Sequence, residues 1–212
     1  MISSSFLTDP KTTLVIDASV AISLNATNRA AEIISALPSV VVVTHNAMDE
    51  LKRGIRNGHT DAQLLQILVD RTLVSPVALG ENSFNVYEAL IDGNALNTLD
   101  DGEAATIAYA IEVRGIAVID EKKARRICGE SFPNLRLLST VDLLLDDLIG
   151  NALGRIGQAE SLYNALVSAR MRVPEEKLSL VINVIGEERA AKCVSLPKAA
   201  RMAKLSTGSL IV

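Results

Sequence analysis

Four consecutive valines, Val40 to Val43, constrain the fold of this 212-residue chain more than any other feature. A strand that is apolar on both of its alternating sides is stable only when both faces of its sheet are covered. Two further β-branched runs, residues 12–16 and 116–119, end directly on Asp17 and Asp120. Because helical periodicity separates these runs, we expect an α/β sandwich around a parallel sheet.

The remaining segments fit the same alternation of strands and helices. Ser19 is expected to cap the first helix, and a short strand is expected at residues 135–138. Residues 72–77 contain Pro76, which confines them to an edge strand or a connector. Helices are expected over residues 28–34, 46–56, 60–71, 83–91, 101–113, 121–128, 140–149, 155–170 and 174–186.

The composition indicates one aliphatic core. The chain is 49% hydrophobic but only 3% aromatic, with no Trp, which excludes global disorder. Its two cysteines are far apart and lack the CxxC spacing of a zinc or redox site. No signal-peptide pattern and no apolar stretch of about 18 residues is present, so a cytoplasmic protein without a membrane partner is expected.

Charge is distributed unevenly along the chain. The net charge of −4 combines −8 over residues 1–150 with +4 over residues 151–212. An acidic chain is not expected to grip nucleic acid with its whole surface. Beyond Arg189 all charged residues are basic, which is typical of a solvated tail. We therefore expect a flexible leader (1–11), a core (12–150), helices packed on it (151–188) and a basic tail (189–212).

Four acidic residues occupy positions that can converge. Asp17 and Asp120 end two strands, Glu50 follows the valine strand, and Glu103 lies in the first turn of a helix. Carboxylates gathered at the carboxyl edge of a parallel sheet repel one another unless a hard cation such as Mg²⁺ or Mn²⁺ lies between them. Singly, each has a structural alternative: a helix cap for Asp17, an ion pair with Lys52 or Arg53 for Glu50, and a helix-dipole interaction for Glu103.

The four acidic residues lie in four short motifs that follow one another along the chain. The motifs are Val15-Ile16-Asp17-Ala18-Ser19, Met48-Asp49-Glu50-Leu51, Leu99-Asp100-Asp101-Gly102-Glu103-Ala104 and Val118-Ile119-Asp120-Glu121-Lys122-Lys123-Ala124-Arg125. In this order they resemble the PIN-domain superfamily of metal-dependent nucleases. The similarity covers roughly residues 12–150 and is strongest to the prokaryotic, VapC-like toxin branch, whose third motif is Asp-x-Gly-Glu.

The resemblance implies a three-layer α/β/α sandwich with a central parallel sheet, here followed by extra C-terminal helices. It implies an endoribonuclease that uses Mg²⁺ or Mn²⁺ and leaves 5′-phosphate and 3′-hydroxyl ends. By position, the catalytic and metal-binding acids fall on Asp17, Glu50, Glu103 and Asp120. Asp101 and Glu121 become auxiliary metal ligands, and Ser19 resembles a small polar residue that orients the first carboxylate.

Cations border the same edge and can meet RNA phosphates. We expect Lys52, Lys122, Lys123 and Arg125 to do so, together with Ser19 as a polar contact. Bound divalent cations would offset the acidic charge of the first 150 residues locally, so the negative net charge does not exclude RNA.

Rival classes fit less well, and one remains open. A haloacid-type phosphatase needs Asp-x-Asp where this chain has Asp17-Ala18-Ser19, and the glycines at Gly150, Gly154 and Gly157 have the wrong spacing for a dinucleotide fingerprint. A receiver-like phosphoacceptor needs an acid pair at the first strand. The open alternative is a catalytically quiet PIN-like interaction module. By resemblance, a toxin role would bring a small antitoxin partner and a homodimer, although this chain is longer than the compact toxins.

Overall fold

A five-stranded parallel sheet forms the centre of the computed structural model, which describes residues 7, 9–92, 94 and 97–202. The strand order is β3-β2-β1-β4-β5, and each neighbouring pair is parallel. The strands are β1 (Thr13–Ile16), β2 (Val40–Thr44), β3 (Ser75–Val77), β4 (Ile116–Val118) and β5 (Arg136–Leu138). The predicted parallel sheet is confirmed, and Pro76 lies in an edge strand as expected.

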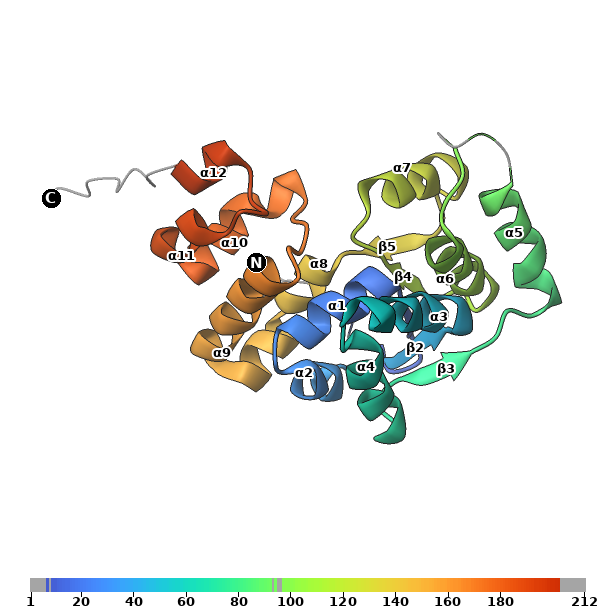
Figure 1. Cartoon of the computed structure of the whole chain (residues 1–212), viewed down its shortest axis with the longest axis horizontal. Helices are drawn as coiled ribbons and strands as arrows, with labels where there is room; N and C mark the ends of the chain where they lie inside the picture. Colours follow the sequence, from blue (N-terminus) through green and yellow to red (C-terminus); the bar gives the residue numbers. More distant parts are fainter. Residues whose placement is uncertain (1–6, 8, 93, 95–96, 203–212) are drawn as a thin grey trace, which may run out of the picture.

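Helices cover both faces of this sheet (Figure 1). One face carries α5 (Glu81–Ile91), α6 (Asp101–Glu112) and α7 (Lys122–Ser131). The other carries α1 (Ala18–Ala26), α2 (Ala30–Ala36), α8 (Thr140–Leu144) and α9 (Asp147–Ser168). A helical hairpin of α3 (His45–Gly54), η1 (Ile55–Asn57) and α4 (Asp61–Asp70) joins β2 to β3. The three-layer α/β/α sandwich is thereby confirmed.

Successive strand residues point into two separate apolar cores. In β1, Leu14 and Ile16 pack into the larger core, whereas Val15 packs into the smaller one. The valine strand follows the same alternation, with Val41 and Val43 on one side and Val42 on the other. Only Val40 is exposed, at 53%. The valine run is therefore explained by a strand that is buried on both faces.

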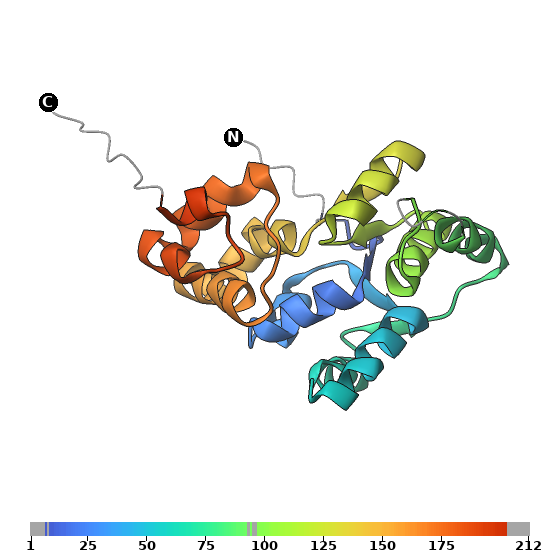
Figure 2. The same ribbon diagram turned by 45° about the horizontal axis from the view of Figure 1, so that its top comes forward.

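The C-terminal helices extend the larger core at one end of the molecule (Figures 1 and 2). They are η2 (Glu175–Lys177), α10 (Leu178–Ile185), α11 (Glu187–Lys192) and α12 (Lys198–Met202). Ala190, Cys193 and Leu196 are buried in the same core as the sheet. Residues 189–202 therefore fold onto the protein instead of forming a solvated tail, because burying these apolar side chains stabilises the packed state. The remainder of the predicted tail (203–212), and positions 1–6 and 8 of the predicted leader, lie outside the described residues.

Two glycines with positive φ interrupt helices, one at a helix end and one at a kink. Gly58, at φ 82°, ends η1, and Gly154, at φ 68°, kinks α9, where we expected a break between two helices. Both cysteines, Cys128 and Cys193, are free and buried. Within the described part of the chain, no helix has the length and apolar character needed to cross a membrane.

Candidate functional site

The strand order reverses between β1 and β4, and acidic residues gather at the carboxyl ends of these two strands. β1 pairs with β4 through Ile16 and Val118, and Asp17 and Asp120 follow the two strand ends. Such a switch point leaves a crevice outside the sheet, where ligands bind in open α/β proteins. Glu50 in α3 and Glu103 in the first turn of α6 approach the same edge from neighbouring helices.

The Asp17 side chain is buried, and only one of its two carboxylate oxygens accepts hydrogen bonds in the described structure. Its Oδ2 accepts hydrogen bonds from the Ser19 backbone nitrogen at 3.2 Å and from Ser19 Oγ at 2.7 Å. Asp17 therefore caps α1, and the expectation that Ser19 is the cap is wrong: Ser19 orients the capping carboxylate. Asp17 Oδ1 is buried without a hydrogen-bond partner in the described structure. Burial raises the pKa of Asp17 to about 6, although the bonds from Ser19 act in the opposite direction.

Gly102 brings Asp17 and Glu50 to one point. A Cβ placed on Gly102 would lie 2.5 Å from Glu50 Oε2 and 3.4 Å from Asp17 Oδ1. A real Cβ does not approach an oxygen to 2.5 Å, so Glu50 keeps this position only because residue 102 is glycine. The third motif therefore has a steric role as well as an acidic one.

Glu50 and Glu103 share this acidic environment. Burial, reinforced by the charges of Asp17 and Asp100, raises the pKa of Glu50 to about 7. Burial, reinforced by the charges of Asp100 and Asp17, raises the pKa of Glu103 to about 8. Both glutamates are thus harder to ionise, first because they are buried and second because Asp17 and Asp100 are close.

Asp100 also belongs to this acidic group, although it was not among the expected site residues. Its side chain accepts a hydrogen bond from the Glu103 backbone nitrogen at 2.9 Å and so caps α6. Its charge contributes to the raised pKa values of Asp17, Glu50 and Glu103. The signal was available, since an acid three residues before a glutamate and an apolar run marks a helix start.

Asp120 has a different environment on the other side of the switch point. Its Oδ1 accepts from the Thr140 backbone nitrogen, and its Oδ2 accepts from Thr140 Oγ1, both at 2.7 Å. Burial raises the pKa of Asp120, and the bonds from Thr140 lower it. Thr140 begins α8, and nothing in the sequence predicts this partner.

The two predicted auxiliary ligands are already engaged by the protein. Asp101 Oδ1 accepts from Tyr87 Oη and from Asn46 Nδ2, the latter at 3.1 Å, and Asp101 Oδ2 lies 3.5 Å from Arg53 Nη2. These bonds join α5 and α3 to the start of α6. The bond to Asp101 is the largest of the contributions that raise the pKa of Tyr87 to about 12. Glu121 Oε1 pairs with Arg172 Nη1 at 2.9 Å.

Two of the four basic residues predicted to bind RNA line a cavity with an acid of the site, and the other two do not. Lys122 and Arg125 line a cavity of about 720 Å³ together with Asp120. Arg125 is held there by a bond from Nη1 to the Ile119 carbonyl oxygen at 3.1 Å. Lys123 lies on the same helix, half-buried. Lys52 is engaged with Asp49, at 2.7 Å, on the exposed side of α3.

The chemistry of the donor set fits a hard divalent cation. The side chains of Asp17, Glu50, Glu103 and Asp120 supply only carboxylate oxygens, and one of these, Asp17 Oδ1, is buried with no donor from the residues that the structure describes. In the described part of the chain, no three His, Cys, Asp or Glu side chains already form a group that could enclose a metal ion. Mg²⁺ does not require such a cage, because it keeps several waters and binds through one or two carboxylates.

The fold and this edge together define an α/β protein with a carboxylate-rich site at the switch point of its sheet. A family model described as a PIN domain matches residues 13–187, which is most of the chain. The protein therefore belongs to the PIN-domain family, and the resemblance seen in the four motifs is confirmed. The match also extends past residue 150 through α10.

The chain is also similar to a solved structure, at a low level of sequence identity. The structure is VapBC2 from Rickettsia felis bound to a DNA fragment from its promoter, with 14% sequence identity and a TM-score of 0.42. The similarity covers 60% of this chain and 98% of that chain. No curated protein matches the sequence. The family assignment rests on the family model.

Proposed function

We propose that this protein is a Mg²⁺- or Mn²⁺-dependent endoribonuclease that hydrolyses RNA phosphodiester bonds. The observation that supports this most strongly is the buried Asp17 Oδ1, which has no hydrogen-bond partner in the described structure and faces the same glycine as Glu50 Oε2. An unpaired buried carboxylate oxygen is costly in a purely structural role. A divalent cation would supply the missing partner.

The proposed roles follow from what each acid contacts. Asp17, Glu50, Glu103 and Asp120 would hold the cation, and Asp100 would add negative charge beside them. A bound Mg²⁺ or Mn²⁺ lowers the pKa of a coordinated water and neutralises phosphate charge. Ser19 keeps Asp17 oriented, and Thr140 does the same for Asp120.

Asp101 and Glu121, the predicted auxiliary ligands, are better suited to positioning. Asp101 holds α3, which carries Glu50, against α6, which carries Glu103, through its bonds to Asn46 and Arg53. Glu121 holds Arg172 beside Asp120. We propose that both act mainly through these partners.

RNA contacts are proposed for the cations near the edge. Lys122 and Arg125 share a cavity with Asp120, which supports a role in holding phosphates close to the acids. Lys123 lies one residue further along α7, and Lys52 lies two residues after Glu50 in α3. Lys123 and Lys52 would contact parts of the RNA that lie further from the acidic residues.

A wider biological role is proposed on the sequence resemblance. A toxin of this branch would act in the cytoplasm as a homodimer and would be held inactive by a small antitoxin protein. Exposed apolar side chains of the α3–α4 hairpin, Ile55, Leu64 and Ile67, are suited to contact between subunits. The alternative is a catalytically quiet PIN-like module, and presence of all four predicted acids favours the enzyme.

RNA cleavage by the purified full-length protein tests the proposal. A single-stranded RNA labelled at its 5′ end should be cut in the presence of Mn²⁺ or Mg²⁺, with 5′-phosphate and 3′-hydroxyl products, and EDTA should stop the reaction. Glu103→Gln should slow cleavage by about 100-fold or more, whereas Glu130→Gln, at an exposed residue of α7 paired with Arg126, should not change it. Metal-independent cleavage, or equal rates for wild type and Glu103→Gln, would exclude the proposed site.

A further inference from the structure

Three adjoining hollows run along the acidic edge, and the chain segment that links α9 to α10 borders all of them. The first, of about 440 Å³, contains Glu50 and Ala169. The second, of about 140 Å³, contains Asp120 and shares Ala169 with the first. The third, of about 720 Å³, shares Asp120 and Arg172 with the second. Because each hollow shares lining residues with the next, we refer to the three together as the groove.

Two arginines of this linking segment line the middle of the groove. Arg170 and Arg172 are both exposed and both face the hollow that contains Asp120 and Glu121. They lie outside the four sequence motifs and more than 150 residues from Asp17 along the chain. The C-terminal part of the protein thus adds positive charge at the place where the core supplies carboxylates.

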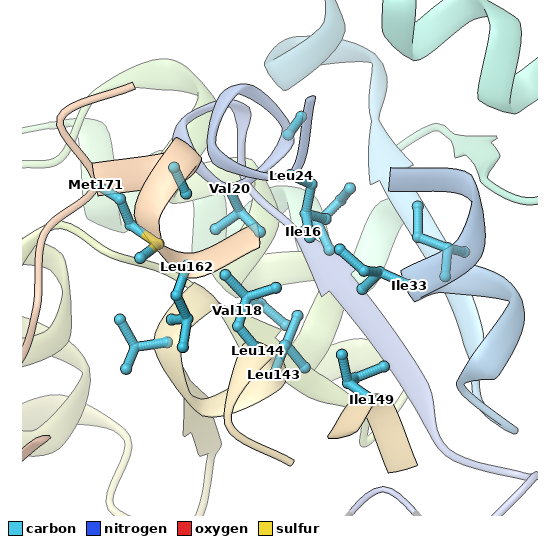
Figure 3. Packing of buried hydrophobic residues seen from close by; sticks show 14 of the residues in the cluster. Ile16, Val20, Leu24, Ile33, Val118, Leu143, Leu144, Ile149, Leu162 and Met171 are labelled. Atoms are coloured by element: carbon cyan, nitrogen blue, oxygen red, sulfur yellow. The ribbon is translucent and has the colours of Figure 1, made fainter. Parts of the chain in front are cut away.

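Met171 fixes the position of both arginines. Its side chain is 2% exposed and packs into the larger core beside Val20 and Leu162 (Figure 3). Its backbone nitrogen donates to the Ala165 carbonyl oxygen at 3.1 Å, which ties the segment to the last turn of α9. A buried anchor between two exposed cations holds them at the groove without a ligand, so little ordering is required on binding.

The wall behind the segment is also attached to the core. Lys177 Nζ pairs with Asp142 Oδ1 at 2.9 Å, which connects η2 to α8. Ser195 Oγ donates to the Leu166 carbonyl oxygen at 3.0 Å, which connects the turn before α12 to α9. The arginines are therefore presented by a fixed surface.

Arg172 forms an ion pair in the described structure, whereas Arg170 does not. Arg172 pairs with Glu121 at 2.9 Å, but the Arg172 side chain is 61% exposed and that of Glu121 35%, so solvent screens the pair and Arg172 can exchange Glu121 for another partner. Arg170 forms no ion pair within the described residues. A guanidinium group binds phosphate through paired hydrogen bonds, so both arginines are available for an anionic polymer that follows the groove.

We propose that Arg170 and Arg172 form a phosphate-binding arm that holds the backbone of single-stranded RNA in the groove beside Asp120. On binding, a phosphate takes the place of Glu121 as the partner of Arg172, and a neighbouring phosphate pairs with Arg170. The proposal rests on the proposed ribonuclease function and assigns part of its substrate binding to the C-terminal helical region.

The backbone of Arg170 allows a sharp test. Arg170 has φ 52°, in the left-handed region that favours glycine, so Arg170→Gly removes the side chain and relieves the backbone at once. Arg114 has the same φ of 52°, is also exposed, and precedes β4, at the amino end of that strand. Arg114→Gly is therefore a matched control with the same change of charge and conformation.

The measurement is the affinity for a 5′-fluorescein-labelled 12-nucleotide RNA, followed by anisotropy in EDTA over a range of salt concentrations. We expect Arg170→Gly and Arg172→Gln each to weaken binding about 3- to 10-fold and to reduce the salt slope by about 0.7. Arg114→Gly should bind as wild type does. Both glycine variants should melt at or above the wild-type temperature, which separates lost binding from lost folding.

The outcomes distinguish this proposal from the function on which it rests. If wild type cleaves RNA with Mn²⁺ but Arg170→Gly and Arg172→Gln bind RNA as tightly as wild type and Arg114→Gly do, the arm is wrong and the nuclease stands. If the two glycine variants lose affinity equally, only net charge matters and the arm is again wrong. If wild type neither binds nor cleaves RNA, the proposed function fails and the arm with it.

Discussion

The two sides of the switch point hold their carboxylates in opposite ways. After β4, both oxygens of Asp120 accept hydrogen bonds from Thr140 at 2.7 Å. After β1, Asp17 has one oxygen bound by Ser19 and one buried without a partner among the described residues, opposite Glu50 and near Asp100. A fully bonded buried carboxylate is stable by itself, whereas a half-bonded one among like charges is not. We therefore propose that the β1 side is the one whose structure a cation would complete.

The largest effect should come from closing the space between Asp17 and Glu50. Gly102→Ala places a methyl group 2.5 Å from Glu50 Oε2, so the Glu50 side chain must move. We expect RNA cleavage to fall about 100-fold, because a displacement of about 1 Å at a reacting centre has an effect of that order. Initial rates under saturating Mn²⁺ measure it.

Gly129→Ala is the matched control for that variant. Gly129 lies in α7, and a Cβ there meets nothing within 4 Å. Its cleavage rate should equal that of wild type. A Gly102→Ala rate within a few-fold of the Gly129→Ala rate would show that the position of Glu50 does not matter.

The acidic residues near β1 should also make the stability of the metal-free protein decrease at high pH. Asp17, Glu50 and Glu103 have pKa values raised from 3.8, 4.5 and 4.5 to about 6, 7 and 8. Between pH 4 and pH 8 the folded state therefore binds more protons than the unfolded state, so the free energy of unfolding falls as pH rises. In EDTA the melting temperature should be several degrees lower at pH 8 than at pH 5, at roughly 2–4 °C per kcal/mol.

Mn²⁺ should reverse this trend, since it binds the ionised carboxylates. Thermal melts should show a larger stabilisation by Mn²⁺ at pH 8 than at pH 5, and Asp17→Asn should reduce both the pH dependence and the response to Mn²⁺. A metal-free melting temperature that rises from pH 5 to pH 8 would mean that burial and the neighbouring charges do not raise the pKa values of these carboxyls.

At Asp120, which follows β4, removing one of the two hydrogen bonds from Thr140 should have a smaller effect. Thr140→Val deletes the donor to Asp120 Oδ2 but leaves the backbone bond to Oδ1. We expect cleavage to fall about 10-fold, as for other partners of metal-binding residues, and stability to fall by about 1–3 kcal/mol. Thr106→Val is the control, because Thr106 Oγ1 is equally buried but has no partner in the described structure. Equal losses in both variants would remove the special role of the Thr140 bond.

The smallest effect should come from Tyr87, which supports the acids from a distance. Tyr87→Phe removes one hydrogen-bond donor to Asp101. The contacts of Asp101 with Asn46 and Arg53 remain. We expect cleavage to fall only about 2- to 3-fold, with Tyr109→Phe in α6 as the control. A loss as large as that of Gly102→Ala would assign Asp101 and its partners to the reaction itself.

Local patterns predicted the fold and part of the site. The valine run required a sheet covered on both faces, and strands that end on Asp17 and Asp120 required a shared edge. Thr140, Tyr87 and Arg172 were not predictable, because their bonds to Asp120, Asp101 and Glu121 join residues 20, 14 and 51 positions apart through tertiary packing. The expected solvated tail failed for a similar reason: its charges were visible in the sequence, but the burial of Ala190 and Cys193 was not.

We propose that the unpaired oxygen of Asp17 meets a divalent cation. Calorimetric titration of Mn²⁺ into the metal-free protein at pH 7.5 tests it, with wild type, Asp17→Asn and Asp70→Asn, an exposed acid at the end of α4, as control. We predict saturable binding by wild type and Asp70→Asn, and at least about tenfold weaker binding by Asp17→Asn. Equal binding by wild type and Asp17→Asn would contradict the account.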